Sequence, residues 1–224
     1  MPRLGVLCGL ASERDTLGRF ATDPRIAVAV SGAVPDKAEE DAERMVSLGC
    51  EALLSWGIAG GLDGRLRPGT TAAPRGILDT DGSVLACHPL DLSGPVQIQH
   101  LAGRDHIVRG AASKAAIFAE TGAAAVDMES HRAARAAARA GIPFLCLRAI
   151  GDPAERNLPP LVEDAVDTVG RPRVGRVLLR LAAAPWHLPA LLALKGDTDR
   201  ALAALTALAP HAIPDCLAIA ERAG

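Results

Sequence analysis

The chain is poor in aromatic residues. Its 224 residues include two tryptophans, three phenylalanines and no tyrosine. Proteins that bind single-stranded nucleic acid stack the bases on exposed aromatic side chains, so this composition argues against that function. The formal net charge is only -2, and lysine and arginine form no cluster, so the usual electrostatic signal for nucleic acid is missing as well. We therefore expect no nucleic-acid partner.

The cysteines lack any pattern that would hold a metal or form disulfides. The five are widely spread, include no CxxC pair and have no paired histidines nearby. This distribution predicts no metal site and a reducing, cytoplasmic location. No signal peptide is recognisable. The most apolar segment, 177–194, contains Arg180, His187 and two prolines, so we expect peripheral contact with the inner face of a membrane rather than a spanning helix.

Short apolar runs alternate with helical patterns along the chain, which predicts an α/β fold. We expect a single domain with a central mixed β-sheet flanked by helices, in which residues 1–172 form the main domain and residues 173–224 a helical C-terminal extension. Prolines at 185, 189, 210 and 214 are expected to break that extension. The predicted strands lie at 3–9, 25–32, 51–61, 70–74, 95–103, 122–128 and 142–152, and the predicted helices at 35–49 and 130–141. The segment DTDGS, 79–83, predicts a hairpin.

Carboxylates follow several of the predicted strands. Glu13 comes after the first strand, Asp127 and Glu129 end the strand at 122–128, and Asp152 ends the strand at 142–152. Because ligands bind beyond the carboxyl ends of strands in open α/β sheets, we expect these four carboxylates to gather on one rim. The alternative is that Asp127 or Ser130 caps the helix that follows.

A glycine-rich segment, GIAGG at 57–61, is predicted to form a turn after the third strand. It matches neither GxGxxG nor a P-loop, which disfavours a dinucleotide-binding dehydrogenase. Glycines permit close approach and expose backbone N–H groups, so the turn is either a cradle for a ribose or an anion, or simply a site of tight packing.

The segments SWGIAGGL, AVDMES and LRAIGDPA occur in that order, and together they resemble the purine nucleoside phosphorylase and methylthioadenosine nucleosidase superfamily over residues 4–155. The stretch VDMESHRAARAAARAGIPFLCLRAIGDPAERNLPP, with the later GRP and VLLRL, looks more narrowly like the hopanoid-associated phosphorylases, up to about residue 205. Those enzymes are implicated in removing adenine from adenosylhopane. The resemblance implies a nucleoside phosphorylase-like fold, a purine nucleoside with an apolar 5′ group as substrate, no cofactor, and a homodimer or higher homo-oligomer.

The resemblance also implies roles for individual residues. Asp152 would be the acid that protonates the departing purine, and Glu13 would activate water, while Glu129 would bind the ribose hydroxyls. An acid at the base and a carboxylate near the ribose suit the charges that develop when an N-glycosidic bond breaks. Arg14 lies near the position of a phosphate-binding arginine in the phosphorolytic members, so inorganic phosphate is a second candidate co-substrate beside water.

The remaining substrate-binding candidates carry less specific signals. Met128 would pack against the sugar, and Asp127, Gly60 and Ile58 would line the site. Ile58 stands where many members of the family carry serine or threonine, and Asp127 replaces the glutamate common in nucleosidases. The aromatic residue that usually stacks on the base is missing; the nearest candidate, Phe118, is expected in the core.

Three functions stay open at this point. The first is release of adenine from adenosylhopane by phosphorolysis or hydrolysis, in hopanoid side-chain biosynthesis. The second is cleavage of methylthioadenosine or adenosylhomocysteine. The third is non-catalytic binding of a nucleoside, although a protein that only binds has no need of an acid at Asp152.

Overall fold

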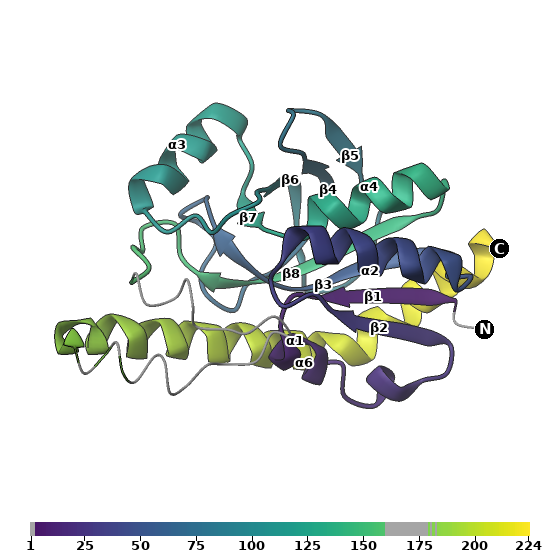
Figure 1. The fold of residues 1–224 in the computed structure, drawn as a ribbon, viewed down its shortest axis with the longest axis horizontal. Helices are drawn as coiled ribbons and strands as arrows, with labels where there is room; N and C mark the ends of the chain where they lie inside the picture. Colours follow the sequence, from purple (N-terminus) through teal and green to yellow (C-terminus); the bar gives the residue numbers. More distant parts are fainter. Residues whose placement is uncertain (1–2, 160–178, 180, 182) are drawn as a thin grey trace.

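A mixed eight-stranded sheet with helices on both faces forms the centre of the protein (Figure 1). The computed structural model describes residues 3–159, 179, 181 and 183–224. The strands are β1 (Leu4–Cys8), β2 (Ile26–Val30), β3 (Ala52–Gly61), β4 (Thr71–Leu78), β5 (Val84–Ala86), β6 (Val96–Gly103), β7 (Ala125–Asp127) and β8 (Phe144–Asp152). The helical elements are α1 (Ala11–Asp15), η1 (Gly18–Thr22), α2 (Pro35–Ser47), α3 (Ala111–Thr121), α4 (Ser130–Ala140), η3 (Pro185–His187) and α6 (Leu188–Ala223). The predicted fold class is confirmed.

The strand pairings combine a parallel half with a closed ring. β2, β1, β3 and β8 are parallel neighbours in that order. β8 then pairs antiparallel with β4, β4 and β6 are parallel, β6 and β7 are parallel, and β7 returns antiparallel to the end of β3. The predicted hairpin is confirmed, since β4 and β5 are antiparallel neighbours across residues 79–83. The ring brings the ends of β3, β7 and β8 to one place.

Each face of the sheet has its own apolar core. Because side chains alternate along a strand, Leu54 and Trp56 of β3 pack on the side covered by α6, while Leu53 packs on the side covered by α2 and α4. The predicted amphipathic helix is confirmed as α2, whose buried residues include Ala38, Ala42 and Met45. All five cysteine side chains are buried and unpaired.

The C-terminal helix contradicts the expected breaks. Pro185 begins η3 and Pro189 lies in the first turn of α6, where a missing N–H is harmless, but Pro210 and Pro214 lie inside α6. A proline in a helix interior costs about 3 kcal/mol. Here the flanking residues Leu205, Leu208, Ile213 and Leu217 are buried in the core, and this packing outweighs the lost backbone hydrogen bonds.

One helical stretch in the described part of the chain, Pro185–Ala223, is long and apolar enough to cross a membrane by length and composition. Of its most apolar window, 44% is buried within the protein. The segment predicted at 177–194 lies partly outside the described residues, and so does the boundary predicted after residue 172. Both stay predictions.

Two local expectations were wrong or incomplete. Residues 57–61 do not form a turn: they continue β3, and Gly60 and Gly61 pair with Val126 and Ala125 of β7. The helix α3 was not expected, because its alanine-rich sequence has no clear apolar stripe. Gly122, which ends α3 in the left-handed conformation with φ 67°, is the signal that would have indicated it.

Candidate active site

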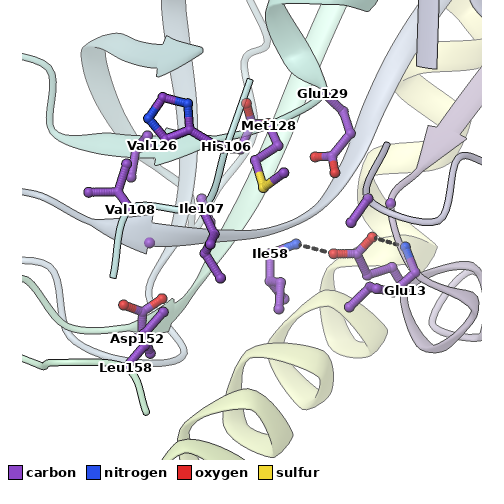
Figure 2. A pocket seen from close by; sticks show the side chains of 16 residues that line it. Glu13, Ile58, His106, Ile107, Val108, Val126, Met128, Glu129, Asp152 and Leu158 are labelled. Carbon is purple, nitrogen blue, oxygen red and sulfur yellow. Dashed lines mark hydrogen bonds between the residues drawn. The ribbon is translucent and has the colours of Figure 1, made fainter. Parts of the chain in front are cut away.

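A cavity of about 190 Å³ lies where the ends of β3, β7 and β8 meet. The four predicted carboxylates, of Glu13, Asp127, Glu129 and Asp152, all line it, so the expectation of a shared rim is confirmed. Figure 2 shows Glu13 and Glu129 at one end and Asp152 at the other. The remaining lining residues are Gly9, Leu10, Ala33, Ile58, Ala59, Gly60, His106, Ile107, Val108, Val126, Met128 and Leu158. The cavity is therefore acidic at both ends and apolar between them.

Glu13 is held by backbone N–H groups from two elements. It lies in the short helix α1 and is only 3% exposed. The N–H of Leu10 donates to Oε2 and the N–H of Ile58 donates to Oε1, both at 2.8 Å (Figure 2). Burial raises the pKa of Glu13, while Arg148 and these N–H groups oppose the rise. A buried carboxylate with a raised pKa is suited to accept a proton near neutral pH.

A glycine of β3 makes room for the Glu13 carboxylate. A Cβ atom built on Gly57 would lie 2.6 Å from the carboxyl carbon of Glu13. A side chain at position 57 and Glu13 in its present place are therefore incompatible. The glycine-rich segment serves the site by this close approach within a strand, not by forming a turn.

Asp127 is bound from behind by a buried arginine. The Nη2 and Nε atoms of Arg148 lie 2.6 and 2.8 Å from Oδ2 of Asp127, and both residues are almost fully buried. Asp127 also accepts a hydrogen bond from the backbone N–H of Ser130, at the first turn of α4, and one from its hydroxyl. The alternative interpretation of Asp127 as a helix-capping residue therefore fits its contacts, and Arg148 provides the compensating positive charge.

Glu129 immediately precedes α4 and is partly buried at the cavity wall. Burial, together with the nearby charges of Asp127 and Glu13, raises its pKa to about 8. Ribose hydroxyls that donate hydrogen bonds to this group would favour its ionised form, because hydrogen bonding to an anion lowers its pKa.

Asp152 ends β8 and is paired with a lysine that the sequence did not indicate. Its side chain is 13% exposed, and its Oδ2 atom pairs with Nζ of Lys114 in α3. Burial raises the pKa of Asp152, and the Lys114 ammonium opposes this rise. Lys114 belongs to the unexpected helix, and its partner is 38 residues away, so no local motif could have indicated it.

The other candidates are divided between the cavity and the surface. Met128, Ile58 and Gly60 line the cavity, but Arg14 does not. The Arg14 side chain is 45% exposed and pairs with Asp15. Its assignment as a phosphate ligand stays a prediction that this placement does not support. Phe118 is 38% exposed and is absent from the lining, so the expectation that it belongs to the core was wrong.

Comparison with known proteins places this geometry in context. Residues 95–183 match the model of the Phosphorylase superfamily. A mutant of the Helicobacter pylori 5′-methylthioadenosine/S-adenosylhomocysteine nucleosidase with 5′-methylthioadenosine in its active site is similar over 93% of this chain and 98% of its own, at 14% identity and a TM-score of 0.65. The chain has a nucleosidase-like fold. At this identity the likeness concerns the fold alone.

Two further solved structures share the nucleosidase-like fold. The native futalosine hydrolase of Helicobacter pylori matches with a TM-score of 0.61 and 18% identity, over 69% of this chain and 86% of its own. The 5′-methylthioadenosine/S-adenosylhomocysteine nucleosidase of Neisseria meningitidis, in complex with methylthio-immucillin-A, matches with a TM-score of 0.62 and 17% identity, over 69% and 87%. No curated protein matches the sequence.

Proposed function

We propose that the protein is an enzyme that hydrolyses the N-glycosidic bond of a purine nucleoside. The observation that carries this proposal is the arrangement of one carboxylate, Asp152, at one end of an apolar cavity and two, Glu13 and Glu129, at the other (Figure 2). Bond cleavage leaves positive charge on the sugar and negative charge on the base, and separated carboxyl groups answer both needs.

In the proposed reaction the C1′–N bond breaks with its electron pair moving to the purine. Asp152 donates a proton to the departing base, and water attacks C1′ as Glu13 accepts a proton from it. Glu129 binds the ribose hydroxyls, and Met128 lies against the sugar. The apolar wall of Ile58 and its neighbours excludes water from the rest of the cavity.

The charge around the cavity favours water over phosphate as the attacking group. Among the described residues that line it, four are acidic and none is lysine or arginine. Arg148 approaches from behind, but its guanidinium already binds Asp127, Ser55 and Ser130. The described lining offers no cation to bind a phosphate dianion, whereas water needs only a base to accept its proton.

The substrate is proposed to carry an apolar 5′ group, as adenosylhopane does, which would give the protein a role in hopanoid side-chain biosynthesis. The sequence resemblance supports this choice. Exposed apolar side chains at the start of α6 and before it also support this choice, because an apolar substrate or a membrane surface would contact such side chains. They are Leu179, Trp186, Leu188 and Leu192. The competing proposal is a small 5′ group, as in the methylthioadenosine that one structural neighbour holds.

The proposal is tested by supplying adenosine, methylthioadenosine, adenosylhomocysteine and adenosylhopane with and without inorganic phosphate. Chromatography and mass spectrometry then quantify adenine, free sugar and sugar 1-phosphate. We expect adenine and free sugar without phosphate, and a loss of at least about 100-fold in kcat for Asp152→Asn and for Glu13→Gln. Glu155→Gln, at an exposed glutamate paired with Arg67, is the matched control.

Each alternative predicts a different result. Sugar 1-phosphate that forms only with phosphate would overturn the hydrolytic proposal. Saturable nucleoside binding without any release of base would identify a binding protein. Faster turnover of methylthioadenosine than of adenosylhopane would favour the small 5′ group.

A further inference from the structure

Lys114 occupies a position that is costly for a lysine. The side chain is fully buried, with 0% exposure, on the helix α3. A buried ammonium group is stable only if hydrogen bonds and an opposite charge replace its water. Nζ meets both conditions: it donates to the carbonyl oxygen of Pro153 at 2.9 Å and of Arg156 at 3.4 Å, and it pairs with Asp152. All three N–H bonds of the ammonium group thus point to acceptors.

The carboxyl group that Lys114 binds is the one at the end of the cavity. Nζ pairs with Oδ2, whereas no hydrogen bond from another described residue reaches Oδ1. The contact therefore engages one of the two carboxyl oxygens of Asp152. Gly60 permits this placement, since a Cβ built there would lie 3.3 Å from Oδ1.

The other charged groups near Asp152 form ion pairs with partners of their own. Arg156, in the loop after β8, forms an ion pair of 2.6 Å with Asp197 of α6, and Arg200 of α6 also binds Asp197. Glu155 is exposed and pairs with Arg67. The residue of β3 that faces Asp152 is Gly60, which carries no charge. Lys114 pairs with Asp152 directly, whereas Arg156 reaches Asp197 instead.

We propose that Lys114 is a positioning residue for Asp152, which fixes the carboxyl group at the cavity wall and stabilises the carboxylate that forms when its proton leaves. This inference rests on the proposed function of Asp152 as the acid. As the C1′–N bond breaks, the proton passes from the carboxyl group to the purine, and the negative charge left on Asp152 stays beside the ammonium group.

The test uses Lys114→Met, which keeps an unbranched side chain one heavy atom shorter and removes its charge. Lys195→Met is the control, because Lys195 is 70% exposed on α6 and its substitution makes the same change in net charge. Aspartate labelled with ¹³C at its side-chain carboxyl reports the ionisation of Asp152 by NMR, and Asp152→Asn assigns the signal. We expect the pKa of Asp152 to rise by about one unit or more in Lys114→Met, and to stay unchanged in the control.

Kinetics provides the second measurement. The activity of an enzyme that needs a protonated acid declines as pH rises through the pKa of that acid. Lys114→Met should therefore move the alkaline limb of the profile of kcat against pH to higher pH by about one pH unit. It should also lower kcat at the optimum pH by about 10- to 100-fold. A purely structural role would lower stability without moving either the limb or the NMR titration, and this result would overturn the proposal.

The two proposals fail in different ways. If the wild-type protein releases base from no nucleoside, the hydrolytic function is refuted, while the NMR titration still decides whether Lys114 controls Asp152. If the enzyme is active and the titration of Asp152 is the same in Lys114→Met, the inference about Lys114 is refuted. Should Lys114→Met not fold, Lys114→Gln, which retains donors for the two carbonyl oxygens, takes its place in both measurements.

Discussion

The substitution Gly57→Ala separates the placement of Glu13 from the integrity of the fold. Gly57 is buried in β3 and has no positive φ, so the alanine backbone itself is unstrained. The added Cβ would lie 2.6 Å from the carboxyl carbon of Glu13, about 0.8 Å closer than the 3.4 Å at which ordinary contact begins. Because the obstructing atoms end a flexible side chain, Glu13 can move aside while β3 stays in place.

The magnitude follows from what Glu13 loses when it moves. Its two hydrogen bonds from the N–H groups of Leu10 and Ile58 would lengthen or break. Hydrogen bonds to a charged group stabilise the folded state by about 1.5–3 kcal/mol each. Replacing a strand glycine with alanine offsets this loss by about 0.5–1 kcal/mol, because alanine loses less conformational entropy on folding. We expect the free energy of unfolding to decrease by about 2–5 kcal/mol, and kcat to decrease about 100-fold because the base is displaced by close to 1 Å.

Urea denaturation and adenine release measure the two effects. Gly64→Ala is the control, since a Cβ at Gly64 meets nothing within 4 Å. In a Glu13→Ala background the obstructing carboxyl group is absent, so Gly57→Ala should change neither stability nor residual activity appreciably. Wild-type kcat in Gly57→Ala, or an equally large loss in the Glu13→Ala background, would refute the reasoning.

Two further predictions concern the buried charges behind the cavity. Glu129 has its pKa raised to about 8, so the folded state retains a proton that the unfolded state releases, and wild-type stability decreases as pH rises from about 4.5 through 8. The stability of Glu129→Gln relative to wild type should therefore increase by on the order of 5 kcal/mol between pH 4.5 and pH 9, at about 1.4 kcal/mol for each unit of the shift. Urea titrations at several pH values measure this, and a difference independent of pH would contradict it. Arg148→Met should lower the free energy of unfolding by about 3–5 kcal/mol, because it leaves Asp127 buried without its partner. The double variant Arg148→Met with Asp127→Asn should lose less stability than Arg148→Met alone. Additive losses in thermal denaturation would contradict the pairing.

Much of the fold could be predicted because its signals are local. Apolar runs and glycines indicated the strands, and the spacing of Ala38, Ala42 and Met45 indicated α2. Local signals failed where distant packing decides the outcome. The apolar flanks of Pro210 and Pro214 are buried against the sheet, so α6 continues through both prolines.

The sequence by itself determined that four carboxylates follow strands of an α/β sheet, because an apolar run that ends at a carboxylate is a local signal. That Asp127 meets Asp152 at one cavity depends on β7 returning antiparallel to the end of β3, which only the tertiary structure shows. Only the tertiary structure decided what each of them does. Ile58 is 45 residues from Glu13 in the sequence, yet its backbone N–H holds the Glu13 carboxylate. Arg148 is 21 residues from Asp127, yet its guanidinium holds the Asp127 carboxylate. The same applies to Lys114 and Asp152, since the charge beside a buried acid depends on distance in space, and no sequence spacing records that distance.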